Sequence, residues 1–328
     1  MVDRGLLYRE WKQNQVVILL SIVFLVLANP LSIVNTYLSY QGCLEHQDPQ
    51  YCDFIVNYQI SNLIDINWVP GIILAFCFLG MERSKGTMDF LLSLPYNKSQ
   101  IFQTKFWLGG LVIVLSQLIG FLLAWLIILA YKPEHVYFFE HSSVGVIVIS
   151  FMAYSLVMAA GAITGNAFAQ LLTALSAAIL PYLIVVLPLM NLEIVFHFHI
   201  YEFFSSIEGY YEMVNKLMYL VPMVFIGDDW LSDNRYILLI PAAMSILFYL
   251  VGYISFKKHP SERNGHFFLW NRLDRPVQIL VMAFGILGFG LFGYSTGHSI
   301  IGYIFGMIIG AVVGFFVSYF SIYKKTKH

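Results

Sequence analysis

Few residues of this 328-residue chain have the type and spacing that enzymatic chemistry requires. Gly288, Gly290 and Gly293 match the GxGxxG pattern of dinucleotide loops, and Ser295 lies in a GxSxG match of the nucleophile-elbow kind. Both motifs need a preceding strand, whereas these matches lie in or beside an apolar run. The chain also contains neither the GxxxxGK[ST] phosphate loop nor the HExxH zinc motif. We therefore expect no enzyme and no ATP hydrolysis by the chain itself.

The HFH tripeptide of His197 and His199 is a candidate metal-binding pair. The two side chains would share a face on a strand, but the i, i+2 spacing separates them by about 200° on a helix. No third ligand is evident from the sequence. We therefore expect no metal and no cofactor in this chain.

The elements that carry these residues are expected to be membrane helices. Hydrophobic residues make up 59% of the chain and charged residues 11%, whereas a soluble domain carries about 25% charged residues. A membrane helix needs about 20 consecutive apolar residues. Eight such runs predict an all-α polytopic membrane protein, and the first run is too long for a signal peptide. The runs cover approximately residues 16–37, 63–80, 106–130, 144–164, 168–190, 236–256, 277–293 and 300–323.

The distribution of charge predicts the orientation. Lys and Arg concentrate in cytoplasmic loops. With the N-terminus inside, 15 of the 18 Lys and Arg residues lie inside, whereas 13 of the 19 Asp and Glu residues lie outside. Losing one span would invert every later loop, so this agreement favours eight spans with both termini cytoplasmic. Nucleic acid is not an expected partner.

Two of the outside segments are long. Residues 38–62 contain Cys43 and Cys52, which face an oxidising side and could pair. Residues 191–235 are acidic and aromatic, and they fold either into an extracellular gate or re-entrant portal or into an interfacial aromatic belt. The sequence alone leaves both questions open.

The spans lack the charged residues that ion-coupled carriers keep at mid-membrane. Asp65 is the one acid within a span, near its outer end. Asn29, Gln117 and Gln170 are expected to hydrogen-bond between helices, and Cys77 to pack. Transport would therefore draw its energy from elsewhere, and an intramembrane enzyme is excluded. Four glycines lie on one face of the last span and predict close helix packing: Gly302, Gly306, Gly310 and Gly314.

The loop after the second span is the most informative segment. Residues 82–95 read ERSKGTMDFLLSLP, and 88–94 form a short apolar helix candidate. We expect a threonine cap at Thr87 and an end at or before Leu94, because Pro95 follows. Met88, Leu91 and Leu92 share a face, and so short a helix cannot hide them all. The helix therefore meets either the membrane interface or another protein.

This ERxxGTxxxLLSLP pattern, followed by Asn97 to Ile101 and Lys105, resembles the coupling-helix loop of type 2 ABC exporter permeases. The segment from Leu6 to Lys12 resembles the amphipathic connecting helix of that family. The whole chain is similar to the Ytr permease subunits of Bacillus, which are described as membrane components of an ABC transporter linked to acetoin utilisation and sporulation.

The resemblance implies partners and roles. A cytoplasmic ABC ATPase subunit, which holds ATP and Mg²⁺, would dock on the coupling loop 82–105, and a second permease subunit, identical or similar, would complete the complex. The chain itself would hold no cofactor. Arg9 and Trp11 would belong to the connecting helix. The residues that would transmit ATP-driven motion are Glu82, Arg83, Gly86, Thr87, Leu91, Leu92 and Pro95.

The family's usual six spans correspond to residues 1–256, which leaves 257–276 as a cytoplasmic basic loop and 277–328 as two additional spans with a basic tail. This loop is either a second contact for a partner or a solvated loop. The expected function is that of a permease subunit. The alternative is a membrane regulator of cell-envelope processes that drives an extracellular partner without any flux. Acetoin is one candidate substrate, and a lipid-like amphipathic molecule is another.

Overall fold

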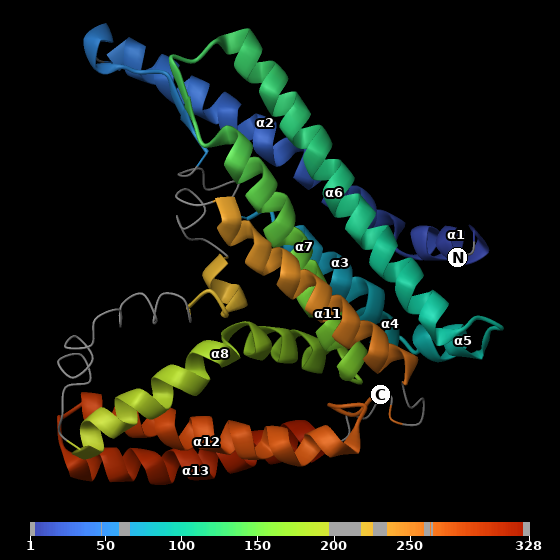
Figure 1. Ribbon diagram of the computed structural model, residues 1–328, viewed down its shortest axis with the longest axis vertical. Helices are drawn as coiled ribbons and strands as arrows, with labels where there is room; N and C mark the ends of the chain where they lie inside the picture. The colour runs from blue at the N-terminus through green and yellow to red at the C-terminus, as the bar shows by residue number, and fades with distance from the viewer. Residues whose placement is uncertain are drawn as a thin grey trace. The chain divides into compact units, whose positions relative to one another are not determined.

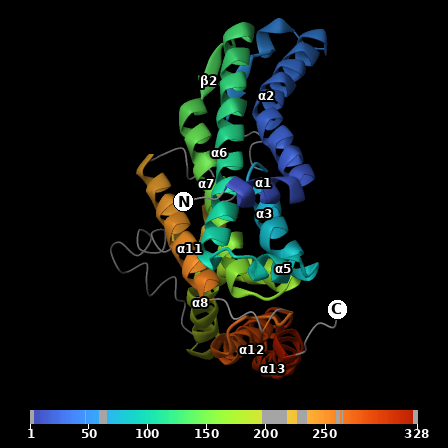
Figure 2. The same ribbon diagram turned by 90° about the vertical axis from the view of Figure 1, so that its right-hand side faces the viewer.

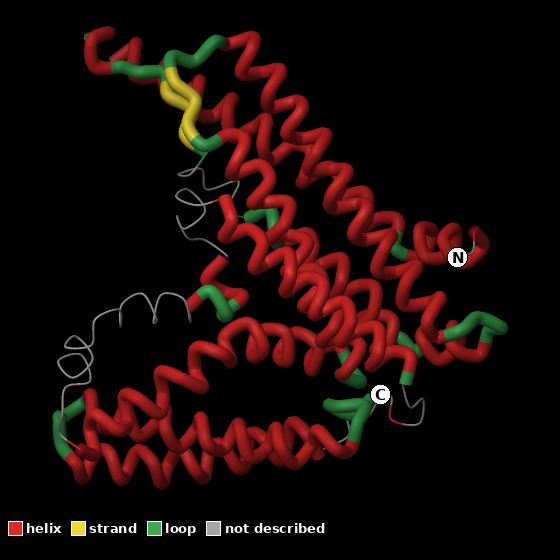
Figure 3. Tube along the Cα trace, viewed as in Figure 1, coloured by secondary structure: helices red, strands yellow, loops and turns green. Residues whose placement is uncertain are grey.

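The computed structural model describes residues 4–46, 48–58, 66–196, 218–225, 235–258, 263 and 265–323. This part of the chain is almost entirely helical (Figure 3), which confirms the predicted all-α membrane fold. Within it, seven helices are long and apolar enough to cross a membrane. They are α2 (Gln15–His46), α6 (Lys98–Tyr131), α7 (Phe139–Ile163), α8 (Ala167–Phe196), α11 (Leu239–Lys257), α12 (Asn271–Ser295) and α13 (Ile300–Tyr323).

The second expected span, over 63–80, differs from the prediction in its described part. It consists of α3 (Val69–Ala75) and the π-helical η2 (Phe76–Met81), of 7 and 6 residues, and the three-residue α4 (Glu82–Ser84) continues the run beyond the expected span. Pro70 lies in the first turn, where its missing N–H costs nothing, and this favours a helix start at Val69. With α4 included, the run measures about 24 Å, compared with a hydrocarbon core of about 30 Å. Asp65 lies outside the described residues.

Shorter elements connect the long helices. Two of them, α1 and α5, lie in segments that the charge distribution predicts to be cytoplasmic, and the others lie in the remaining connections. Their bounds are α1 (Arg4–Gln13), η1 (Pro49–Tyr51), β1 (Ile55–Asn57), α5 (Thr87–Ser93), β2 (His135–Tyr137), η3 (Pro222–Phe225) and η5 (Arg235–Leu238). His197, His199 and most of the 191–235 segment lie outside the described residues, so the portal and aromatic-belt alternatives stay predictions.

Packing divides the chain into two compact units, Met1–Ala162 with Val224–Lys258 and Ile163–Met223 with His259–His328. The first unit contains α1 to α7 and α11, and the second contains α8, α12 and α13 (Figure 1). The predicted partition at residues 256 and 276 stays a prediction. The structure groups α8 with the C-terminal helices because α8 packs on α12.

In the first unit, α2 runs beside α6, with α1 and α5 near one end and the strands at the other (Figures 1 and 2). Strands β1 and β2 pair in parallel, with Ile55 opposite His135, and so join the connections that follow α2 and α6. Cys43 and Cys52 form a disulfide at this strand end, with 5.9 Å between their Cα atoms. The structure thereby decides the pairing that the sequence left open.

Polar side chains inside the first unit link its helices. Asn67 Nδ2 donates to Asn29 Oδ1 at 3.3 Å, and Gln117 Nε2 donates to Ser150 Oγ at 2.8 Å. All four side chains are buried. Gln117 is therefore an interhelical hydrogen-bond partner, as predicted, whereas the partner of Asn29 lies in the turn before α3.

In the second unit, α12 and α13 pack closely through glycines. A Cβ built on Gly306 would collide with the backbone of Phe289, and one on Gly310 with the backbone of Gly285. Gly302 and Gly314 likewise lie against the α12 backbone. Tyr303 Oη donates to Asn191 Oδ1 at 2.8 Å, which adds α8 to the pair.

The loop expected over 257–276 is only partly solvated. Phe267, Phe268 and Leu269 are buried, and Thr164 forms an antiparallel bridge with Phe268. Lys257 and Arg272 are exposed. The alternative of a wholly solvated loop is therefore wrong for residues 267–269, because these apolar side chains cover the start of α8.

Candidate functional site

The candidate site lies at the end of the first unit that carries α1 and α5. The α5 helix begins after Gly86, whose φ of +71° places it in the left-handed region that glycine tolerates. It ends at Ser93, before extended Leu94 and Pro95, as the sequence predicts. The expected threonine cap is wrong. Gly86 is the N-cap residue, and Thr87 Oγ1 donates instead to the backbone oxygen of Glu82 at 3.1 Å.

A buried cluster of three charged groups lies beneath this loop. Lys105 Nζ on α6 donates to Glu82 Oε1 of α4 at 2.7 Å and also to the carboxylate of Glu10 on α1. The three side chains are at most 3% exposed. Arg9, one quarter exposed, adds an ion pair to Glu10 at 3.1 Å. Removing one partner from such a cluster would leave a buried charge without compensation, so these elements are held in one arrangement.

Arg83 extends these connections to α7. Its buried guanidinium donates to the backbone oxygen of Gly161. Burial lowers the pKa of Arg83 below its ordinary value, and the neighbouring carboxylates of Glu82 and Asp89 partly offset this effect. Burial likewise raises the pKa of Glu82, and the positive charge of Lys105 only partly opposes that rise.

Tyr154 of α7 completes the connections from the other side. Its hydroxyl donates to the backbone oxygen of Lys105 at 2.9 Å. Its ring lies where a Cβ on Gly109 would otherwise be, so α7 approaches α6 closely. Both Tyr154 and Lys105 are fully buried. The loop, the N-terminal helix and two long helices therefore meet around one charged cluster.

Two relatives cover the full length of this chain, although no protein-family model matches it. It is 83% identical over 327 residues to the probable ABC transporter permease YtrC of Bacillus subtilis (strain 168), with all of both chains covered. It is 49% identical over 330 residues to the probable ABC transporter permease YtrD of the same strain, covering 100% of this chain and 99% of that protein. The chain belongs to the ABC transporter permease family. It is thus a multi-pass protein of the cell membrane, and the predicted resemblance is confirmed.

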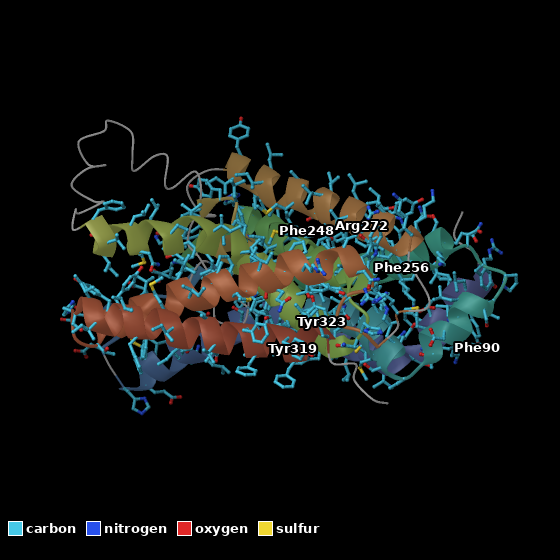
Figure 4. The ribbon with its side chains drawn as sticks, turned by 90° about the horizontal axis from the view of Figure 1, so that it is seen from below. Phe90, Phe248, Phe256, Arg272, Tyr319 and Tyr323 are labelled. Carbon is cyan, nitrogen blue, oxygen red and sulfur yellow. A yellow bond between two sulfur atoms is a disulfide. The ribbon has the colours of Figure 1, made fainter. Side chains whose placement is uncertain are left out.

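The permease exposes only part of its predicted coupling residues. Gly86 and Pro95 are exposed, and Thr87 and Leu92 are half-buried. Leu91 is fully buried together with Met88, because both pack inside the first unit. Phe90, by contrast, is 62% exposed and lies at the outer edge of α5 (Figure 4). A partner that approaches α5 would therefore meet Phe90 before Leu91.

In the predicted connecting helix, Trp11 is half-buried and Arg9 pairs with Glu10. Sequence reasoning missed the roles of Glu10, Lys105 and Tyr154. For Glu10 and for Lys105, the sequence offered one indication that the charged side chain is buried. Glu10 lies four residues after Leu6 on the buried face of α1, and Lys105 sits between Phe102 and Phe106, in the first turns of an otherwise apolar helix.

Proposed function

We propose that the permease is the membrane subunit of an ATP-driven transporter and that a cytoplasmic ATP-binding subunit docks on residues 84–95. The single observation that carries this proposal is the pair of faces on α5. Met88 and Leu91 anchor the helix inside the first unit, while Phe90 remains 62% exposed. An exposed aromatic side chain on an anchored helix is well suited to enter a pocket on a partner.

The charged cluster supplies a route for motion from the dock to the spans. Displacing α5 would displace α4, and Glu82 would carry that displacement to Lys105 on α6 and Glu10 on α1. Arg83 would pass it to the end of α7. ATP and Mg²⁺ would be bound by the partner subunit, and a second permease subunit would complete the pathway.

An external energy source fits the placement of charge. Among the described residues, the buried charged side chains are Glu10, Glu82, Arg83, Lys105 and Asp274. Lys105 and Asp274 lie in the first turns of α6 and α12, and the other three lie outside the long helices. A carrier driven by protons or ions would keep charged groups within the spans. ATP hydrolysis by a partner would remove that need.

The docking proposal is tested with a matched pair of variants. Phe90→Asp should reduce co-purification of a co-expressed ATP-binding subunit by about tenfold or more, the effect of losing one buried aromatic anchor. Tyr51→Asp is the control, because Tyr51 is 78% exposed near the disulfide, at the opposite end of the first unit. Equal recovery of the ATP-binding subunit with both variants would contradict the proposed dock.

The proposed transport role, linked by resemblance to acetoin utilisation, has a separate test. Proteoliposomes that contain the complex should move labelled acetoin only with ATP. ATP hydrolysis that responds to the permease without movement of acetoin would exclude it as the cargo. Hydrolysis without flux of amphipathic probes as well would favour the cell-envelope regulator.

A further inference from the structure

A polar pocket and an apolar groove meet at Val17 on one side of the first unit. The pocket, of about 250 Å³, is lined by the turn between α1 and α2 and by residues from Cys77 to Lys85. The groove, of about 600 Å³, runs between α2 and the segment from Ile66 to Ile73. Because they share a lining residue, the two lie next to each other, one polar and the other apolar.

The accessible charge of the pocket is positive. Lys12 and Lys85 line it and are exposed, and neither forms an ion pair with any residue that the structure describes. Glu82 also lines the pocket, but its side chain is only 3% exposed and is paired with Lys105. The pocket lies beside α1 and α4, at the cytoplasmic end of α2, where the head groups of the inner leaflet are found.

The groove suits a hydrocarbon chain. Ser21 is the one polar residue among the twelve that line it. The lining residues on α2 extend from Val17 to Leu31, which is about 21 Å along the helix. Since the hydrocarbon core is about 30 Å thick, the groove begins at the inner interface and passes the midplane.

We propose that this composite site binds one anionic glycerophospholipid of the cytoplasmic leaflet. Its phosphate lies in the pocket with Lys12 and Lys85, and one acyl chain lies in the groove between α2 and α3. A free phosphate would use the pocket but leave the groove empty, and an apolar helix of a second subunit would fill the groove but place no anion beside the two lysines. A lipid with an anionic head group satisfies both parts.

Native mass spectrometry of the purified permease tests this site without nucleotide or ATPase, so its outcome is independent of the proposed dock. The wild type should retain added dioleoylphosphatidylglycerol in preference to dioleoylphosphatidylcholine. The Lys12→Gln, Lys85→Gln double variant should bind phosphatidylglycerol about thirtyfold more weakly, as expected for two basic residues near an anionic head group. The matched control Lys257→Gln, Lys258→Gln, which removes two exposed cytoplasmic charges elsewhere, should bind as the wild type does.

A second pair of variants tests the groove. Leu27→Trp with Ile73→Trp narrows it and should also weaken phosphatidylglycerol binding, whereas Leu122→Trp with Leu126→Trp, on the exposed face of α6, should not. Equal lipid binding by all variants would overturn the proposal. Displacement of the lipid by inorganic phosphate would overturn it in favour of an anion pocket. If the groove variant abolished permease dimers but left lipid binding unchanged, the proposal would be overturned, and the groove would instead bind a second copy of the permease.

Discussion

Lys105 Nζ lies 2.7 Å from Glu82 Oε1, although both side chains are almost completely buried. Glu10 supplies a second carboxylate from α1, 95 residues earlier in the chain. Burying a charge is tolerated only when partners compensate it. The N-terminal helix, the proposed coupling loop and α6 therefore depend on one another, and a substitution at any of the three residues should affect all three elements.

Replacing Lys105 with Met should destabilise the permease by about 3–5 kcal/mol, because two buried carboxylates then lose their common partner. Thermal unfolding of the purified protein in detergent measures this loss. Lys258→Met removes an exposed charge and serves as the control. The triple variant Glu10→Gln, Glu82→Gln, Lys105→Met should recover part of this stability, because the three side chains of the cluster are then uncharged. A midpoint for Lys105→Met equal to that of the control would contradict a role for the cluster.

The raised pKa of Glu82 predicts a dependence of stability on pH. Burial raises this pKa above the ordinary 4.5, so the folded protein keeps a proton that the unfolded chain has already lost. The contribution of Glu82 to stability should therefore fall as pH rises from 4.5 through the raised pKa. The unfolding midpoint of the wild type minus that of Glu82→Gln should decrease with rising pH across this window. A constant difference would show that the proton affinity of Glu82 is the same in both states.

The disulfide predicts which thiols can be labelled from outside the cell. After mild reduction of intact cells, a membrane-impermeant maleimide should label Cys43, which is half-buried at the end of the first unit opposite α1 and α5. Cys77 is buried in η2 and should stay unlabelled. Mass spectrometry of the labelled peptides measures both results. Labelling of Cys43 without reduction, or only after cells are opened, would argue against the pairing or the orientation.

Two glycines of the C-terminal hairpin offer a matched comparison. Gly310→Ala places a methyl group against the Gly285 backbone and should cost about 1–3 kcal/mol by overpacking. Gly288→Ala meets no heavy atom within 4 Å and should be neutral or stabilising by up to about 1 kcal/mol, because alanine favours the helix. Unfolding midpoints of the two variants give the comparison. Similar midpoints would mean that α12 and α13 can separate without loss.

Much of the membrane architecture could be predicted from local sequence. Hydropathy locates a span within some twenty neighbouring residues, and seven of the eight expected spans appear as long helices in the described chain. The end of α5 before Pro95 was also predictable, because proline restricts the residue before it. The absence of a threonine cap could not be predicted. The left-handed conformation of Gly86 lets the Thr87 hydroxyl donate a hydrogen bond to the backbone oxygen of Glu82.

The sequence by itself therefore determined the membrane class, the number of apolar runs and the expected orientation, and it indicated the loop that we propose as the docking site. Tertiary structure decided which residues of that loop are available, since Leu91 is buried and Phe90 is exposed. It also decided that Glu10, Glu82 and Lys105 form one cluster. The physical reason is the separation along the chain over which each effect acts. Hydropathy and turn preferences act between neighbouring residues, whereas a buried charge is compensated by partners that folding brings from distant parts of the sequence.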